Sequence, residues 1–240
     1  MPTPVSARRA PEIIGHRGAP RAYAENTLPA FREAISLGAD AVELDVHLTR
    51  DGAVVVHHDP IPRARAADGT RSGRRFSELT LAEVQSFRLE GGLVIPSLPE
   101  VLAEIDGRVD VYVEVKGHGA ERAVADLLGP RATWTAVHAF DHRVVPRVRA
   151  LVPALRGGVL LDSYLIDTCS AMRAAGASDL WQRWEFIDES LVGDVHEAGG
   201  RVIAWTVDDL QAAEYLARIG VDGICTDVPG AIREALSRSA

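Results

Sequence analysis

The sequence predicts an α/β protein, a (β/α)8 TIM barrel with a short insertion after the second strand. Short β-rich runs alternate along the chain with stretches of amphipathic helical pattern, and eight strand–helix units can be counted. Strands that alternate with helices in this way need crossover connections and therefore a parallel sheet. The 240 residues fit one closed barrel, which we expect as a single domain over residues 1–240, and no fixed-period repeat indicates a solenoid.

The first part of the chain contains three predicted strands, at residues 12–15, 41–46 and 53–56. The Asp51-Gly52 pair between the last two strands is a turn signal and predicts a hairpin. A helix is expected between the first two strands, because Asn26 or Thr27 can cap it and Pro29 suits its first turn.

Residues from about 60 to 95 are more polar and are expected to form an insertion over one end of the barrel. One short helix is predicted inside it, at residues 79–87, and its arginines are expected to be solvated. After the insertion, Ser97 and Glu100 form a capping-box pattern that predicts a helix ending at Ile105.

From residue 109 onward the alternation is regular. Predicted strands cover residues 109–115, 133–139, 155–161, 178–181, 201–205 and 221–225. Predicted helices cover residues 120–128, 143–151, 165–175, 189–198, 210–219 and 230–237. The strand at 178–181 is short and has the weakest pattern of the set.

Composition restricts the kinds of partner. A formal charge of −8 and a pI of about 5.5 argue against binding to nucleic acid or to anionic membranes, but not against a small anionic substrate. Cys169 and Cys225 are far apart and are expected to be small apolar residues, not a disulfide. No apolar run reaches membrane-spanning length, and Met1 to Pro11 lack a signal-peptide pattern, so a cytoplasmic location is expected.

The sharpest chemical signal is a pair of carboxylates at the end of the second predicted strand. Glu43 and Asp45 are two residues apart, so their side chains point to the same face of the strand. Glu114 and Lys116 repeat this spacing at the end of a neighbouring strand. In a barrel these strand ends form the active-site face, and three converging carboxylates suit a hard divalent cation, Mg²⁺ or Ca²⁺, and also Mn²⁺. The alternative is that Glu43 and Asp45 form buried salt bridges with Arg17 and Lys116.

Two histidines at strand ends, His16 and His58, are the candidates for general acid–base catalysis, because the imidazole pKa lies near neutrality. The alternative for either one is an ordinary hydrogen-bonded polar residue. His47 and His57 are rivals, although strand alternation puts His57 and His58 on opposite faces, so that only one of them easily enters the pocket.

The remaining candidates would bind substrate. Arg17 and Lys116 could contact phosphate oxygens or balance the charge of the carboxylates. Trp205 ends an apolar strand and could pack on the substrate, or be an ordinary aromatic of the core or rim. Asn26 is expected to cap a helix or fix a loop.

Taken in order, these motifs resemble the glycerophosphodiester phosphodiesterase family over nearly the whole chain, from about Ile13 to Ile232. They are His16-Arg17-Gly18, Glu25-Asn26-Thr27, Glu43-x-Asp45, Asp51-Gly52, His58-Asp59, Glu114-x-Lys116, Trp205-Thr206-Val207 and Thr226-Asp227-x-Pro229.

The resemblance implies a barrel enzyme that hydrolyses glycerophosphodiesters to glycerol 3-phosphate and an alcohol. It implies roles for the residues singled out above: His16 and His58 in catalysis, Glu43, Asp45 and Glu114 as metal ligands, and Arg17, Lys116 and Trp205 as substrate contacts. The bulky segment from Leu180 to Glu185 departs from the expected pattern and could re-aim the pocket around the alcohol.

A mechanism follows as an expectation. One histidine would take the proton of the glycerol 2-hydroxyl as that oxygen attacks phosphorus, the other would protonate the departing alcohol, and water would open the cyclic phosphate. Direct attack of water is the rival route, and the sequence leaves open which histidine is the base.

Three other functions remain alternatives: the same reaction on a lysophospholipid, a non-catalytic phosphate-ligand-binding barrel, and an aldolase-like site with Lys116 as a Schiff-base lysine. The preferred alcohol, the native metal and the oligomeric state are not predicted.

Overall fold

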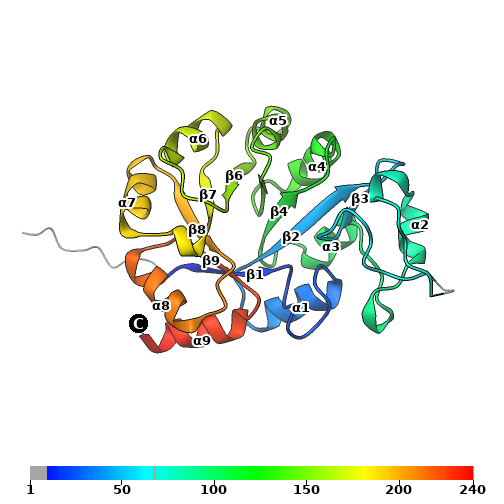
Figure 1. Cartoon of the computed structure of the whole chain (residues 1–240), viewed down its shortest axis with the longest axis horizontal. Coiled ribbons are helices and arrows are strands. Elements are labelled where there is room, and N and C mark those ends of the chain that lie inside the picture. The colour runs from blue at the N-terminus through cyan, green and yellow to red at the C-terminus, as the bar shows by residue number, and fades with distance from the viewer. Residues whose placement is uncertain (1–9, 67–68, 240) are drawn as a thin grey trace, which may run out of the picture.

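The computed structural model of the chain describes residues 10–66 and 69–239. Within these residues, eight parallel strands form a closed barrel, which confirms the expected (β/α)8 fold (Figure 1). The barrel strands are β1 (Glu12–His16), β2 (Ala41–Leu48), β4 (Asp110–Val115), β5 (Thr135–Ala139), β6 (Arg156–Leu161), β7 (Asp179–Arg183), β8 (Arg201–Trp205) and β9 (Gly223–Thr226). The segment Met1 to Arg9, which makes up most of the stretch that lacks a signal-peptide pattern, lies outside the described residues.

The helices follow the strands and form an outer layer. They are α1 (Leu28–Ser36), α2 (Leu81–Ser86), α3 (Leu98–Ile105), α4 (Glu121–Leu128), α5 (Val144–Leu151), α6 (Thr168–Ala175), α7 (Glu189–Glu197), α8 (Leu210–Ile219) and α9 (Pro229–Ser239). The predicted capping box is present at α3, where Glu100 accepts hydrogen bonds from both the backbone and the hydroxyl of Ser97.

The barrel closes because β1 pairs in parallel with both β9 and β2. The short strand β3 (Val54–Val56) pairs antiparallel with β2 and completes the predicted hairpin. The strand with the weakest sequence pattern, β7, extends to Arg183, two residues beyond the predicted end.

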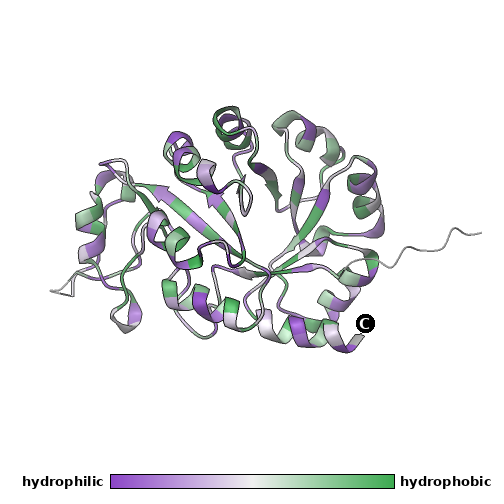
Figure 2. Ribbon diagram, turned by 180° about the vertical axis from the view of Figure 1, so that it is seen from behind, coloured by the Kyte–Doolittle hydropathy of each residue, from purple (hydrophilic) through white to green (hydrophobic). Residues whose placement is uncertain are grey.

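The inside of the barrel is a packed core. One buried cluster takes one side chain from each of the eight parallel strands, which places it on the barrel axis: Ile14, Ala41, Tyr112, Ala136, Leu160, Trp181, Ile203 and Cys225. Two larger apolar clusters fill the space between the strands and the surrounding helices. Hydrophilic residues are nonetheless present on the strand ribbons as well as on the helices (Figure 2).

The insertion between β3 and α3 projects to one side of the barrel (Figure 1). It contains α2 inside the predicted helical range, and it has a small apolar cluster that includes Val55, Phe76 and Ile95. Its arginines are exposed, as expected, and one of them, Arg74, also forms an exposed ion pair with Glu83.

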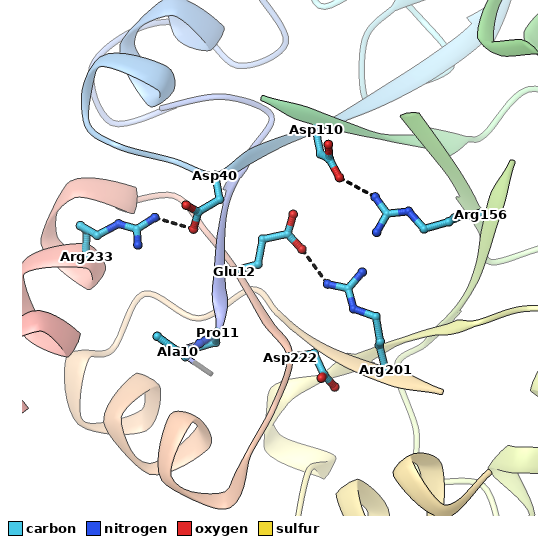
Figure 3. A pocket seen from close by; sticks show the side chains of 9 residues that line it. All are labelled: Ala10, Pro11, Glu12, Asp40, Asp110, Arg156, Arg201, Asp222 and Arg233. Atoms are coloured by element: carbon cyan, nitrogen blue, oxygen red, sulfur yellow. Dashed lines mark hydrogen bonds and ion pairs between the residues drawn. The ribbon is translucent and has the colours of Figure 1, made fainter. Parts of the chain in front are cut away.

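The end of the barrel formed by the N-termini of the strands is occupied by charged side chains that satisfy one another (Figure 3). Arg201 bonds to Glu12 at 2.7 Å and to the hydroxyl of Tyr112 at 3.2 Å. Arg156 bonds to Asp110 at 2.6 Å. Because these arginines and carboxylates are paired within the chain, we expect that removing one partner of a pair destabilises the fold.

No helix among the described residues has both the length and the apolarity needed to cross a membrane. The cytoplasmic location stays a prediction. Both cysteines are free thiols, as expected.

The charged end of the barrel leads to a stability prediction. Arg201→Leu removes the partner of Glu12 and of the buried Asp179, so the free energy of unfolding should fall by about 2–4 kcal/mol. Urea denaturation measures this. Arg122→Leu breaks only the exposed pair with Asp126 and should change stability by less than about 0.5 kcal/mol. Equal effects of the two substitutions would contradict the assignment of the charged end of the barrel as a stabilising layer.

Candidate active site

Strand register brings the chemically interesting side chains together at the opposite end of the barrel. His16 of β1 lies beside Glu43 of β2, Asp45 of β2 beside Glu114 of β4, and Glu114 beside His138 of β5. Paired residues of parallel strands point to the same face, so the i and i+2 positions of β2 both project into the barrel. The convergence expected from the Glu43-x-Asp45 spacing is therefore present.

The turn after β1 positions Arg17. Arg17 and Gly18 both have positive φ, of 54° and 91°, and a Cβ on Gly18 would lie 2.6 Å from the backbone of Ala30. This tight turn directs the backbone N–H of Arg17 to a carboxylate oxygen of Glu43 at 3.1 Å. The guanidinium group lies 3.1 Å from Asp45, so Arg17 contacts two of the three acids.

Asp45 is the acid held most firmly in its charged form. Its two oxygens lie 3.1 Å from Nε of Arg17 and 3.3 Å from Nζ of Lys116, and Asn26 donates to it at 2.8 Å. Burial opposes ionisation, but Arg17 and Lys116 outweigh burial and lower the pKa of Asp45 to about 2. The alternative expectation, a buried salt bridge with Arg17 and Lys116, is thus present for Asp45.

Glu43 and Glu114 are in the opposite situation. Burial, followed by the charge of Asp45, raises the pKa of Glu43 well above its ordinary value, and the same causes raise that of Glu114 to about 7. Lys116 contacts Glu114 at 2.8 Å but is shared with Asp45. Two cations therefore face three buried carboxylates, which leaves an excess of negative charge.

A divalent cation fits this arrangement. Glu43, Glu114 and His138 each offer a ligand atom, and these atoms lie within 4.8 Å of one another. Two buried atoms nearby, Oδ1 of Asp45 and Nδ1 of His138, have no hydrogen-bond partner within the described residues. Oxygen donors with one available nitrogen suit Mg²⁺, Ca²⁺ or Mn²⁺.

The two candidate catalytic histidines are supported in the same way. Nδ1 of His16 lies 2.8 Å from a carboxylate oxygen of Asp227, and Nδ1 of His58 lies 2.9 Å from Asp59. A carboxylate at Nδ1 fixes that nitrogen as the donor and leaves Nε2 for another partner. Burial, more than any other factor, lowers the pKa of His58.

The two rival histidines, His47 and His57, are buried and held by contacts within the protein. His57 is buried and accepts a hydrogen bond from the backbone of Arg63 at 3.1 Å, and burial lowers its pKa to about 4. His47 is buried, bonds to the carbonyl oxygen of His58 at 3.0 Å and stacks on Phe76. Both rings are thus held by the insertion and its neighbours.

A cavity of about 250 Å³ lies at this end of the barrel, and His16, His58, Glu43 and Glu114 line it. Trp205 is half-buried at its wall and meets Phe140 edge to face, with ring centroids 5.6 Å apart. Of the bulky segment flagged in the sequence, Trp181 enters the barrel and stacks on His138 at 4.2 Å. Trp184 packs on the outer apolar cluster instead.

Sequence reasoning missed one residue of this site, His138. His138 lies in an apolar strand, and its only signal is that it has the same alternation as Phe140, which lines the same cavity. Of the two readings for Asn26, the cap is wrong because Thr27 holds that position. Asn26, at φ 58°, ties its loop to β2 through bonds to both the carboxylate and the backbone of Asp45.

Comparison with known proteins identifies the family. The model of the glycerophosphoryl diester phosphodiesterase family matches residues 16–231. A glycerophosphodiester phosphodiesterase of Caldanaerobacter subterraneus subsp. tengcongensis is 32% identical, over 90% of this chain and 94% of its own. The chain belongs to this family. The resemblance found in the motifs and the assignment as a phosphodiester hydrolase are thereby confirmed.

Solved structures agree with this. A phosphodiesterase of Oleispira antarctica, in complex with the product sn-glycerol-3-phosphate, superposes with a TM-score of 0.85 at 25% identity and covers 95% of this chain and 97% of its own. The glycerophosphodiester phosphodiesterase of Thermotoga maritima gives a TM-score of 0.80 at 26% identity, covering 94% and 98%.

The acid cluster leads to a prediction on metal binding. Mg²⁺, Ca²⁺ or Mn²⁺ should raise the melting temperature, by an amount equivalent to about 2.7 kcal/mol at a hundred times Kd, and Glu43→Gln should abolish the rise. His138→Phe keeps an aromatic ring on Trp181 but removes the nitrogen donors. If His138 is a ligand, this variant should lose affinity for Mn²⁺ more than for Ca²⁺.

Differential scanning fluorimetry with each chloride salt measures these shifts. Glu189→Gln, an acid in the first turn of α7, is the control and should keep the wild-type response. A wild-type protein whose melting temperature responds to none of the three ions would contradict the metal site.

Proposed function

We propose that the chain hydrolyses glycerophosphodiesters to glycerol 3-phosphate and an alcohol, using His16 and His58 as the acid–base pair and a divalent cation at Glu43, Asp45 and Glu114, with His138 as a further candidate donor. One observation carries this proposal: two imidazoles, each held by a carboxylate, flank a buried cluster with more carboxylates than cations. A bound divalent cation would neutralise charge that builds on the non-bridging phosphate oxygens.

The placement of the two histidines suggests their roles. Both line the smaller cavity, but His58 also lines an adjoining larger one, and His16 does not. The glycerol phosphate would lie in the smaller cavity against Trp205, with Arg17 and Lys116 as the cations nearest its phosphate. The alcohol would then depart on the His58 side, which makes His58 the acid and His16 the base in the first step.

In that step, His16 accepts the proton of the glycerol 2-hydroxyl while this oxygen bonds to phosphorus. The bond from phosphorus to the alcohol breaks, and His58 gives its proton to the departing oxygen. In the second step, His58 takes a proton from water as the water oxygen bonds to phosphorus. The bond to the 2-oxygen breaks, His16 returns its proton to that oxygen, and glycerol 3-phosphate remains.

The aldolase-like alternative has less support. Burial would lower the pKa of Lys116, but Asp45 and Glu114 outweigh it and raise the pKa above its ordinary value. A Schiff-base lysine needs a neutral amine, and this one is held as the ammonium ion. The alternatives of a lysophospholipid substrate and of a non-catalytic binding barrel stay open predictions.

The cyclic route makes a prediction about the substrate. A diester of propane-1,3-diol phosphate, which lacks the 2-hydroxyl, should react at least about a hundredfold more slowly than the glycerol diester, because the internal nucleophile is missing. Release of the alcohol in a coupled assay measures this. Equal rates on the two diesters would support direct attack by water instead.

The two histidines should respond differently to the leaving group. In a single-turnover measurement of alcohol release, which follows the first step alone, His58→Ala should lose about 10²- to 10⁴-fold in rate with an alkyl alcohol but much less with a nitrophenyl ester, whose alcohol leaves without a proton. His16→Ala should lose similar factors with both. His196→Ala, whose ring pairs with Asp222, is a folding control and should retain activity. If the nitrophenyl ester restores the activity of His16→Ala and not that of His58→Ala, the roles of the two histidines as acid and base are reversed.

A further inference from the structure

A groove adjoins the active-site cavity on the side of the insertion. Its volume is about 650 Å³, against about 250 Å³ for the active-site cavity, and His58, Glu114, Lys116 and Phe140 line both. The outer walls of the groove come from the insertion and from the loops that follow β4 and β5. The groove therefore begins at the position where the proposed reaction releases the alcohol.

We infer that this insertion groove binds the departing alcohol, and that Arg75 on its outer wall selects alcohols that carry an anionic group. The inference rests on the proposed function and adds to it a substrate class: glycerophosphodiesters with a carboxylate or a phosphate on the alcohol portion. Arg75 would determine specificity without taking part in the bond changes.

The charges of the groove lead to this assignment. Asp59 is engaged by His58 and Arg63, and Asp141 by two hydrogen bonds from Arg143, both of 2.8 Å. These two acids that line the groove are thus neutralised within the protein.

The basic side chains that line the groove are not all paired. Lys116 is engaged by Asp45 and Glu114, and the ring of His47 bonds to the carbonyl oxygen of His58 at 3.0 Å. In contrast, no hydrogen bond or ion pair involves the guanidinium group of Arg75 or the ring of His118 anywhere in the described residues. Glu114, the third acid of the groove, belongs to the cluster that the proposed divalent cation would neutralise. With that cation bound, the charge that the groove leaves available is positive, and it is complementary to an anion.

The backbone of Arg75 is fixed even though its side chain is exposed. Its N–H donates to Glu78 at 2.7 Å, and the next residue, Phe76, is buried and donates its own N–H to Pro60 at 3.0 Å. The ring of Phe76 also stacks on His47 at a centroid distance of 5.4 Å. A fixed backbone limits the positions that the free guanidinium group can sample, which lowers the entropic cost of binding an anion.

Two substrates that differ by one carboxylate test the role of Arg75. Glycerophosphoserine and glycerophosphoethanolamine share the same scaffold, and the wild type should show the higher kcat/KM with the serine compound. Arg75→Gln should lower the serine-to-ethanolamine ratio by about threefold to tenfold, the range of a partly exposed ionic contact.

Arg71→Gln is the matched control, because Arg71 is an exposed arginine of the same insertion that does not line the groove. It should leave the ratio at the wild-type value. A ratio that does not change in Arg75→Gln, or that falls equally in both variants, overturns the inference while leaving the proposed function intact. If the wild type hydrolyses neither compound, the proposed function fails and the inference fails with it.

The location of the alcohol has its own test. Ser77 is exposed and lines the groove, so Ser77→Trp should fill the groove without disturbing the core. This variant should lose about tenfold in kcat/KM with the serine and ethanolamine diesters and much less with glycerophosphomethanol, whose alcohol is too small to extend along the groove. An equal loss with all three would place the alcohol elsewhere.

Discussion

The site depends on one constraint, which is that three carboxylates are buried at the same end of the barrel with only two cations beside them. Strand alternation makes Glu43 and Asp45 point inward together, and the pairing of β2 with β4 adds Glu114 next to Asp45. Arg17 and Lys116 satisfy Asp45, so the excess charge falls on the other two acids, whose pKa values rise. Either protons or a divalent cation can remove that excess, and only the cation leaves both carboxylates charged at neutral pH. The candidate metal site is thus a consequence of the geometry of two neighbouring strands.

The two ends of the same strands show why only one end is a site. At the N-terminal end, Arg201 and Arg156 meet Glu12 and Asp110 with short hydrogen bonds, and the buried Asp179 lies 3.7 Å from Arg201. At the C-terminal end, Nδ1 of His138 has no hydrogen-bond partner within the described residues, and Oδ1 of Asp45 has only the ion pair with Lys116 at 3.3 Å. Paired charges stabilise a fold, whereas unpaired buried atoms cost free energy unless something binds to them. The same alternation of residues therefore produces a stabilising layer at one end and a binding site at the other.

Much of the fold and part of the site follow from sequence because they depend on local spacing. The period of two placed Glu43 with Asp45, and the recurring strand–helix pattern gave the barrel. What the sequence could not predict depends on contacts between distant segments. His138 is a ring in an apolar strand whose importance comes from Glu43 and Trp181, and Asn26 acts across 19 positions on Asp45. The cations around Asp45 also depend on a turn at Arg17 with positive φ, which spacing alone does not reveal.

The insertion makes the two halves of the active site unequal. His16 and His58 have matching carboxylate partners, so the support of each ring does not distinguish them. The difference is that His58 directly follows the hairpin from which the insertion grows, whereas His16 lies against the rigid pairing of β1 with β2 and β9. The half of the site near His16 is built from barrel strands and has little freedom to change shape. The half near His58 is bounded by loops, which tolerate changes in length and residue type. A phosphodiester with one constant and one variable alcohol is matched by this division, with the glycerol phosphate on the strands and the departing alcohol among the loops.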